Sequence, residues 1–361
     1  MKIKEIFKRF LPPTSKRFTD EIYSLKKEFE KQKSDIQKLL QLKAELKDLP
    51  DYPIYWENEF EKRIVLKNWG SVKELPDFEE KYFRLIAGMD EASITIINRI
   101  ISRQDVYLHT DNKKCSLFTR EEQKQIRELH ENFHREIFQI SDNLYSYRKY
   151  FLPVNHFESS VFYFRHGIDE LRTKERVNGR VILDVGGFIG DSVLVLSELN
   201  PCDIYTFEAD PDNFNLLQKT LEINHIKNAI PINSALGDHC GTCSFQRSGA
   251  MSSIVPREGV KYTEEIEVSM TTLDEFVSTH PMNIGLIKVD IEGGEPNFLE
   301  GAKKTICEQK PILLISIYHN AHDFFEIKPM IEKWGLGYHF SIHKPTNGNA
   351  TSETLLICEC L

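Results

Sequence analysis

Short apolar runs that alternate with helical patterns dominate the second half of the chain. From Val181 to Ile317, runs rich in Val, Ile and Leu are separated by segments with the spacing of amphipathic helices. This alternation is typical of a parallel sheet whose strands are joined by crossover helices. The predicted strands are Val181–Val185, Ile204–Phe207, Ala229–Ile232, Leu286–Val289 and Ile312–Ile317, and the predicted helices are Ser192–Leu199, Asp212–Asn224, Leu273–Thr279 and Pro296–Ile306.

The C-terminal end of the chain adds a helix and two strands to this pattern. A helix is predicted over Asp323–Trp334, and strand-like runs follow at Tyr338–Ile342 and Thr354–Cys358. The polar loop Lys344–Ser352 between these runs predicts an antiparallel hairpin at one edge of the sheet. The sequence therefore predicts an α/β fold with a seven-stranded, mostly parallel sheet within residues 154–361.

A glycine-rich turn follows the first predicted strand and leads into a helix. The turn contains Gly186, Gly187 and Gly190, in the order G-G-x-x-G. In an open α/β sheet a nucleotide-like ligand lies at this end of the strand, and glycine lets the ligand approach the backbone closely. A dinucleotide site needs G-x-G-x-x-G, and Phe188 stands where that motif has its second glycine. The turn therefore argues against NAD.

Two carboxylates accompany the glycine turn. Asp184 lies two residues before Gly186, where it would repel a pyrophosphate but attract a sulfonium or an ammonium group. Glu208 ends the second predicted strand and can accept both hydroxyls of a ribose. Asp210 and Pro211 then begin the next helix as its cap and first residue. The charges favour S-adenosylmethionine, a nucleoside with two cations and no phosphate, as the cofactor.

The first part of the chain has a mostly helical pattern. Residues 1–48 are predicted to form amphipathic and coiled-coil-like helices, residues 49–153 a helical domain, and residues 154–361 the α/β domain. The helical patterns with their cap residues are Phe78–Ile86, Glu91–Ser102 after Asp90, and Glu121–Phe151 after Thr119.

The first two segments of this part suggest partners. Residues 1–11 place apolar side chains on one helical face with Lys and Arg beside it, which suits either peripheral membrane contact or packing on the rest of the protein. Residues 19–46 follow a short, interrupted heptad pattern, through which a homo-oligomer could form. The net charge of −9 argues against a broad nucleic-acid surface.

A metalloprotease-like pattern and seven scattered cysteines have ordinary explanations. His130 and His134 match H-E-x-x-H, which on a helix can hold zinc, but no third ligand is apparent and we predict a solvated or packed helix face. No secretory signal precedes the cysteines, and Cys240 and Cys243 lack the second pair that a zinc site needs, so we predict reduced thiols. No apolar stretch of about 18 residues is present to span a membrane, and the expected location is cytoplasmic.

Several runs along the second half resemble one family. They are ILDVGGFIGDS, YTFEADPDNFNLLQKTLEIN, NSALGDHCG, TTLDEF and IKVDIEGGEPNFLEGA, and together they are similar to FkbM-type methyltransferases over residues 151–361. The resemblance implies a Rossmann-like class I methyltransferase fold, S-adenosylmethionine as donor and O-methylation. It further implies that Asp184, Gly186, Gly187, Gly190 and Glu208 contact the cofactor, with Ala235 and Asp238 near the adenine. Many relatives have Ala-Asn where this chain has Gly187-Phe188.

Methyl transfer to an oxygen needs an aligned acceptor and a group that takes up its proton. Candidates must lie at the carboxyl ends of strands, and Asp290, Glu292 and His319 are predicted there. Asp290 and Glu292 could also hold Mg²⁺ or bond the amides of the following glycines, and Glu295 is expected to cap a helix.

Three functions are compatible with the sequence. The first is methylation of a sugar hydroxyl in surface-polysaccharide or glycan biosynthesis, a substrate class that comes from the resemblance. The second is methylation of another small hydroxylated metabolite. The third is a non-catalytic scaffold in which the helical part binds a partner.

Overall fold

The computed structural model describes Lys27, residues 67–109 and residues 118–361. The chain divides into two compact units, Met1–Pro53 and Ile54–Leu361, and the account below concerns the second. The amphipathic segment 1–11 and the heptad segment 19–46 lie outside the described residues, apart from Lys27.

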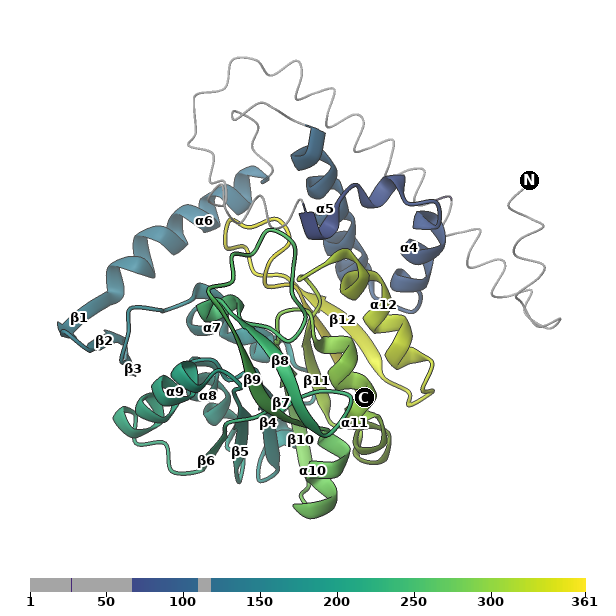
Figure 1. Cartoon of the computed structure of the whole chain (residues 1–361). Helices are drawn as coiled ribbons and strands as arrows, with labels where there is room; N and C mark the ends of the chain where they lie inside the picture. The colour runs from purple at the N-terminus through teal and green to yellow at the C-terminus, as the bar shows by residue number, and fades with distance from the viewer. Residues whose placement is uncertain (1–26, 28–66, 110–117) are drawn as a thin grey trace. The chain divides into compact units, whose positions relative to one another are not determined.

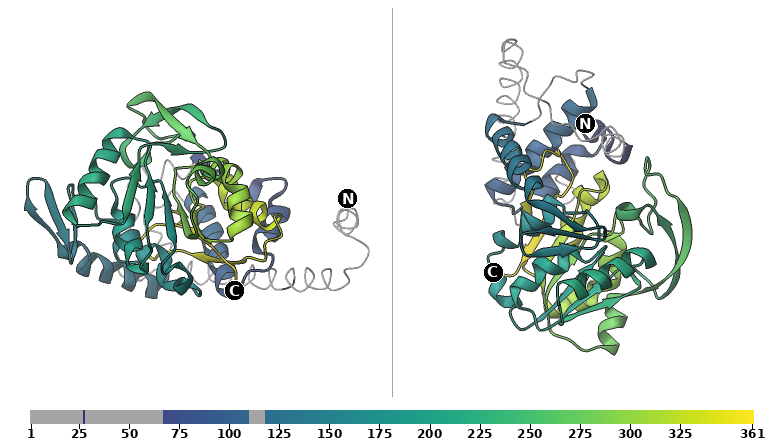
Figure 2. Two further views of the ribbon diagram at one scale, coloured as in Figure 1. Left: turned by 90° about the horizontal axis from the view of Figure 1, so that it is seen from below. Right: turned by 90° about the vertical axis from the view of Figure 1, so that its left-hand side faces the viewer.

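A seven-stranded sheet forms the centre of the second unit (Figures 1 and 2). Its strand order is β12-β13-β11-β10-β4-β5-β6, and the five strands from β11 to β6 run parallel. Strand β13 is antiparallel to both β11 and β12, so the reversed edge is confirmed. The strands are β4 (Val181–Val185), β5 (Ile204–Phe207), β6 (Ala229–Ile232), β10 (Ile284–Val289), β11 (Ile312–Ser316), β12 (His339–His343) and β13 (Leu355–Glu359).

The helices that connect these strands form two packed groups. One group contains α8 and α9, and the other contains α10, α11 and α12, as expected for crossover helices on the two faces of a doubly wound sheet. Strands β4, β10, β11 and β13 are buried along their whole length, because both faces of the sheet are covered. The helices are α8 (Asp191–Leu196), α9 (Pro211–Ile223), α10 (Leu273–Thr279), α11 (Glu295–Gln309) and α12 (Ala321–Glu332).

A second, three-stranded sheet was not predicted from the sequence. It has the order β7-β9-β8, formed by β7 (Ala235–Leu236), β8 (Gly241–Arg247) and β9 (Glu264–Thr271). The long strands β8 and β9 are largely exposed and carry polar and charged side chains, so they lack the apolar runs by which the central strands were found. Helix α11 packs closely against this region, because a Cβ at Gly301 would lie 1.9 Å from the carbonyl oxygen of Gly237.

The helical pattern before residue 151 is interrupted earlier than predicted. Helix α6 (Arg120–Asn132) begins with the expected capping box between Thr119 and Glu122, but it ends well before Phe151. A three-stranded antiparallel sheet follows instead, consisting of β1 (Ile137–Ser141), β2 (Leu144–Tyr147) and β3 (Tyr150–Leu152). The prediction of a helix over Glu121–Phe151 was therefore wrong in its second half, because Asp142-Asn143 forms a two-residue hairpin loop.

Helix α4 (Phe78–Ile86) packs on α12, and α5 (Glu91–His109) follows it. The buried side chain of Lys328 on α12 donates to the carbonyl oxygens of Arg84 and Ala87 at the end of α4, at 3.3 and 2.6 Å. The indole of Trp69 donates to the carbonyl oxygen of Tyr318. Buried polar contacts therefore join these helices to the α/β part.

Two further features concern the predicted location. In residues 67–109 and 118–361 no helix has the length and apolar character to cross a membrane. The six cysteines of the described part, Cys240 and Cys243 among them, are free thiols.

Candidate functional site

A cavity of about 720 Å³ opens at the carboxyl ends of the central parallel strands. Gly186 after β4, Glu208 after β5, Asp290 after β10 and His319 after β11 all line it. These are the strand ends where open α/β sheets bind their ligands. The cavity volume lies in the range of small-molecule sites.

The glycine turn after β4 has little room for side chains. Gly186 has a φ of +85°, and a Cβ there would lie 1.9 Å from the carbonyl oxygen of Asp290. A Cβ at Gly187 would lie 2.1 Å from Oγ1 of Thr206, and Gly190 has a φ of +83°. Of the three glycines only Gly186 lines the cavity, so Gly187 and Gly190 act by allowing the turn to pack.

Asp184 is fully buried behind the turn and does not line the cavity. Its Oδ2 accepts hydrogen bonds from Oγ of Ser192 at 2.8 Å and Oγ1 of Thr206 at 2.9 Å. Its Oδ1 lies 3.1 Å from Nζ of Lys288, which in turn donates to the carbonyl oxygen of Gly186. The carboxylate therefore fixes the turn, and its charge is already paired with an ammonium group.

Glu208 faces the cavity and is tied to the glycine turn. Its Oε2 accepts from the backbone N–H of Phe188 and its Oε1 from that of Asp210, both at 2.8 Å. Burial raises the pKa of Glu208 to about 7, although these backbone N–H groups lower it. Asp210 caps α9 as predicted and also pairs with Arg247, a partner that the sequence did not indicate.

The wall beyond Glu208 is mainly apolar and comes from the second sheet and the turn after β8. Ala235 lies in this wall, as the family resemblance implies. Asp238 does not, because it is exposed and bonded to His239 and Asn297. The apolar lining residues of this wall are Ala209, Ala235, Leu236, Phe245, Ala250, Met251 and Ile254.

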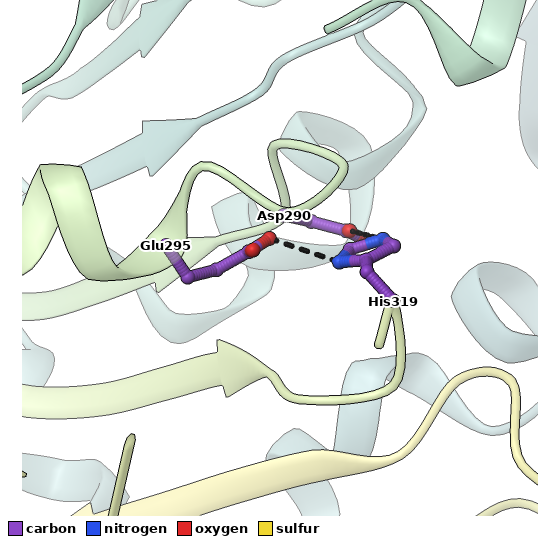
Figure 3. A group of neighbouring side chains, drawn as sticks. All are labelled: Asp290, Glu295 and His319. Atoms are coloured by element: carbon purple, nitrogen blue, oxygen red, sulfur yellow. Dashed lines mark ion pairs between the residues drawn. The ribbon is translucent and has the colours of Figure 1, made fainter. Parts of the chain in front are cut away.

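An acid–imidazole cluster, made of Asp290, Glu292, Glu295 and His319, lies where β10 and β11 end. Figure 3 shows three of its members, Asp290, Glu295 and His319. Nε2 of His319 lies 3.3 Å from Oδ1 of Asp290 and 3.5 Å from Oε1 of Glu292. Nδ1 of His319 lies 3.1 Å from Oε1 of Glu295. The structure thus brings the three predicted catalytic residues together and adds Glu295 as a fourth.

Burial and pairing set the protonation of this cluster. Burial lowers the pKa of His319, but Glu295 and Asp290 outweigh it and raise the pKa to about 9. Burial raises the pKa of Asp290, but His319 and Lys288 outweigh it, so the net shift is downward. His319 therefore carries a proton at neutral pH in this network and is not a free base.

Glu295 was predicted to cap a helix, but the N-cap of α11 is Gly294 and Glu295 is the first residue of the helix. Its side chain is fully buried, and its two oxygens accept from the backbone N–H groups of Ile291 and Gly293 at 2.9 and 3.0 Å. The same carboxylate lies 3.1 Å from Nδ1 of His319. The sequence signal for this role was the E-G-G-E spacing from Glu292 to Glu295. This spacing places a second carboxylate near the end of β10.

The opposite end of the cavity is formed by residues that sequence reasoning missed. They come from the segment before and within α7 (Ser159–Phe162), from the loop between β12 and β13, and, for Tyr318, from the segment after β11. Burial raises the pKa of Glu353 to about 8, as do Glu158 and Asp290, while Ser160 lowers it. The polar lining residues of this end are His156, Glu158, Ser159, Ser160, Tyr318, Asn347, Asn349, Ser352 and Glu353.

Backbone strain is concentrated around the cavity. Nine non-glycine residues in the described part have positive φ, and four of them, His166, Phe188, Glu292 and Glu353, line the cavity. Such conformations cost about 1–3 kcal/mol each and gather at functional sites. This concentration supports the cavity as the site of function.

His130 and His134 also line the cavity, but the H-E-x-x-H motif does not form one helical face. Helix α6 ends at Asn132, and the two imidazole rings stack with their centroids 5.1 Å apart. Burial and His134 lower the pKa of His130. Among the residues that the structure describes, the acidic and imidazole groups that lie within 4.8 Å of one another are those of Asp290, Glu295 and His319, and His130 belongs to no such group.

Comparisons with known proteins agree with this architecture. The chain is 22% identical over 176 residues to Methyltransferase 1 of Beauveria bassiana, covering 43% of this chain and 71% of that protein. Its fold is similar to the crystal structure of an FkbM methyltransferase from Methylobacillus flagellatus, with a TM-score of 0.52, 18% identity and 82% of this chain aligned. The alignment spans 62% of that structure's chain.

The family model agrees with both relatives and covers the strands that build the cavity. Residues 184–340 match the model of the methyltransferase FkbM domain. This stretch includes the glycine turn, Glu208 and the acid–imidazole cluster. Residues 184–340 thus match a methyltransferase FkbM domain, and the C-terminal part of the chain is similar to methyltransferases of that family.

Proposed function

We propose that the protein is an S-adenosylmethionine-dependent O-methyltransferase that acts on a sugar hydroxyl in surface-polysaccharide or glycan biosynthesis. The observation that carries this proposal is a single cavity with two chemically different ends on either side of the glycine turn. One end is apolar and contains a ribose-binding carboxylate, and the other is lined by hydroxyl, amide and carboxyl groups.

The cofactor fits the apolar end. Glu208 accepts the ribose hydroxyls, and the wall around Ala235 and Leu236 receives the adenine. Gly186 allows the methionine part to approach the backbone, because no side chain intervenes. Asp184 supports this end indirectly by holding Lys288 and the turn in place.

The acceptor end suits a neutral, hydroxyl-rich molecule. The lysine and arginine among the described lining residues, Lys288 and Arg257, are paired with Asp184 and Glu292. An anionic acceptor would meet the carboxylates of Glu158 and its neighbours without a free cation to bind it. Sugar hydroxyls, in contrast, can both donate to carboxylates and accept from amides.

The reaction transfers a methyl group from the sulfonium to the acceptor oxygen. A C–O bond forms as the C–S bond breaks, the electron pair of the broken bond stays on sulfur, and the hydroxyl proton leaves to a base. We assign Asp290 and Glu292 to orient the hydroxyl and take up this proton. His319, protonated in this network, positions both carboxylates.

Calorimetry with S-adenosylmethionine tests the cofactor site. Wild type should bind, and Glu208→Gln should weaken binding about tenfold or more through loss of a charge-assisted hydrogen bond. Asp212→Asn, at an exposed residue on the next helix, is the matched control and should bind like wild type. Equal affinity in all three proteins would refute the assignment of Glu208, and a lack of binding by wild type would refute the cofactor.

A methyl-donor assay against glycans extracted from the source organism tests the acceptor. Methylated sugar in the product, together with S-adenosylhomocysteine, supports the proposal. Cofactor binding with methylation of other extracted metabolites but not of glycans would favour the alternative substrate class. Cofactor binding without turnover on any extract would favour the scaffold.

Three proposals concern the protein's surroundings. The location is cytoplasmic, residues 1–11 contact a membrane surface peripherally, and residues 19–46 form a homo-oligomer. Removal of residues 1–13 should reduce partition onto anionic vesicles, and removal of residues 1–48 should convert the oligomer to a monomer in light scattering. Unchanged partition or an unchanged mass would contradict the respective proposal.

A further inference from the structure

The acid–imidazole cluster has the arrangement of a metal site with a supporting outer carboxylate. We propose that Asp290, Glu292 and Nε2 of His319 bind one divalent transition-metal ion, and that Glu295 holds the histidine for it. This inference deepens the proposed function, because the metal would lie at the acceptor end of the same cavity. Only the use of the metal rests on the proposed function; the binding of the metal does not.

The two spacings from Nε2 of His319 to the proposed carboxylate ligands fit neighbouring ligands of one ion. Metal–ligand distances of about 2.0–2.2 Å place neighbouring ligand atoms about 3 Å apart. Nε2 of His319 is 3.3 Å from Oδ1 of Asp290 and 3.5 Å from Oε1 of Glu292. Small side-chain movements toward a common centre would complete this geometry.

Several polar atoms of this cluster lack the hydrogen bonds that buried polar groups normally make. Both ring nitrogens of His319 and Oδ1 of Asp290 are buried without a well-formed hydrogen bond, and the side chain of His319 has 0% exposure. Buried polar groups are nearly always bonded, so such atoms call for a ligand. Figure 3 shows Nε2 of His319 directed toward Asp290 and Nδ1 toward Glu295.

Glu295 occupies the place of an outer-sphere partner. A metal-binding histidine normally donates its second ring N–H to a carboxylate, which fixes the tautomer and the ring orientation. Nδ1 of His319 lies 3.1 Å from Glu295, whose oxygens are anchored by two backbone N–H groups. This leaves Nε2 as the atom that faces Asp290 and Glu292.

Charge also favours a dication at this position. Around neutral His319 there are four carboxylates, Asp184, Asp290, Glu292 and Glu295, and two cations, Lys288 and Arg257. A divalent ion balances more of this negative charge than a proton on His319 does. The two carboxylates and one imidazole favour Mn²⁺ or Zn²⁺ over Mg²⁺, which prefers oxygen ligands alone.

Metal binding is measured on the chelator-treated full-length protein, with Mn²⁺ as the probe. Electron paramagnetic resonance follows the loss of the free Mn²⁺ signal, and the electron spin echo detects nitrogen coupling from an imidazole ligand. We expect one ion per chain with nitrogen coupling. Asp290→Asn and Glu292→Gln should abolish binding, and Glu295→Gln should weaken it about 10- to 100-fold.

A matched control and a folding check make the result decisive. Glu158→Gln removes a carboxylate from the same cavity but not from the ligand set, so it should bind Mn²⁺ like wild type. Each variant must keep its thermal unfolding midpoint within a few degrees of wild type. If a variant loses stability beyond this, Glu292→Asp is measured in its place. No binding by wild type, undiminished binding in the ligand variants, or Mg²⁺ binding as tight as Mn²⁺ would overturn the proposal.

The proposed function is tested apart from the metal. Calorimetry with S-adenosylmethionine is repeated on the metal-free protein. Cofactor binding without metal binding would overturn the metal site and leave the methyltransferase proposal intact.

Discussion

Replacing Glu353 by Gln should change how stability depends on pH. Burial raises the pKa of this carboxyl from 4.5 to about 8 in the folded protein. Because the folded state holds this proton more tightly than the unfolded state, the contribution of Glu353 to wild-type stability is greatest below pH 4.5 and falls as pH rises toward 8. Glu353→Gln removes this loss, since glutamine does not titrate.

The size of the effect follows from the gap between these two pKa values. A gap from 4.5 to 8 corresponds to at most about 5 kcal/mol of unfolding free energy. Glu353 is partly exposed, and solvent screening reduces the expected gain to about 2–3 kcal/mol. Glu353→Gln should therefore be more stable than wild type by this amount above pH 8, and equal to it below pH 4.5.

Urea unfolding across this pH range measures the difference directly. Glu175→Gln, at an exposed position outside the cavity, is the matched control and should show no pH-dependent difference. Glu158→Gln removes one of the charges that raise the pKa of Glu353, so it should move the midpoint of the wild-type pH profile downward. A constant difference between Glu353→Gln and wild type at every pH would refute the reasoning.

Three other substitutions test the packing that supports the site. Gly301→Ala places a methyl group against the carbonyl oxygen of Gly237 and should lower the unfolding free energy by about 1–3 kcal/mol; an unchanged thermal midpoint would contradict this. Lys328→Ala leaves the final carbonyl groups of α4 without their buried donor and should cost about 2–4 kcal/mol in urea unfolding. Asp184→Asn leaves the ammonium group of Lys288 buried and unpaired, and should cost about 3–5 kcal/mol in the same assay; a stability equal to wild type would show that the pair does not hold the turn.

The sequence predicted the central sheet well because four of its seven strands, β4, β10, β11 and β13, are buried along their whole length. All seven strands and the reversed edge were found from apolar runs and helical spacing, which are local signals. The second sheet was missed because exposed strands such as Gly241–Arg247 carry no such run. The hairpin after Asn132 was missed because helical periodicity was extended past a two-residue loop.

The sequence predicted the site residues that follow the strands of the central sheet, but not those that come from distant loops. Glu208, Asp290, Glu292 and His319 were found because the carboxyl ends of parallel strands meet at one edge of the sheet. Glu353 was not found, because its loop is brought to the cavity by a hairpin at the sheet edge and no local pattern marks it.

The role of a charged residue depends on the residue with which it pairs in the folded protein, and Asp184 is an example. Its position suggested attraction for a cationic ligand, but Lys288 from β10 pairs with it and then holds the carbonyl oxygen of Gly186. That pairing depends on β10 lying next to β4, a neighbour far away in the sequence. The electrostatic preference for a cationic nucleoside therefore has to come from Glu208 and the cavity as a whole, with Asp184 acting through the shape of the turn.

Non-glycine residues with a positive φ contribute to other parts of the site. Phe188, Glu292 and Glu353 adopt a left-handed backbone that glycine or asparagine would adopt at lower cost. In two of them the conformation has a consequence at the cavity: the N–H of Phe188 donates to Glu208, and the carboxylate of Glu292 lies beside His319. Packing elsewhere must offset about 1–3 kcal/mol for each of them. Four of the nine non-glycine residues in the described part that depart from local conformational preference line the cavity, so local rules predict the sheet better than the chemistry at its edge.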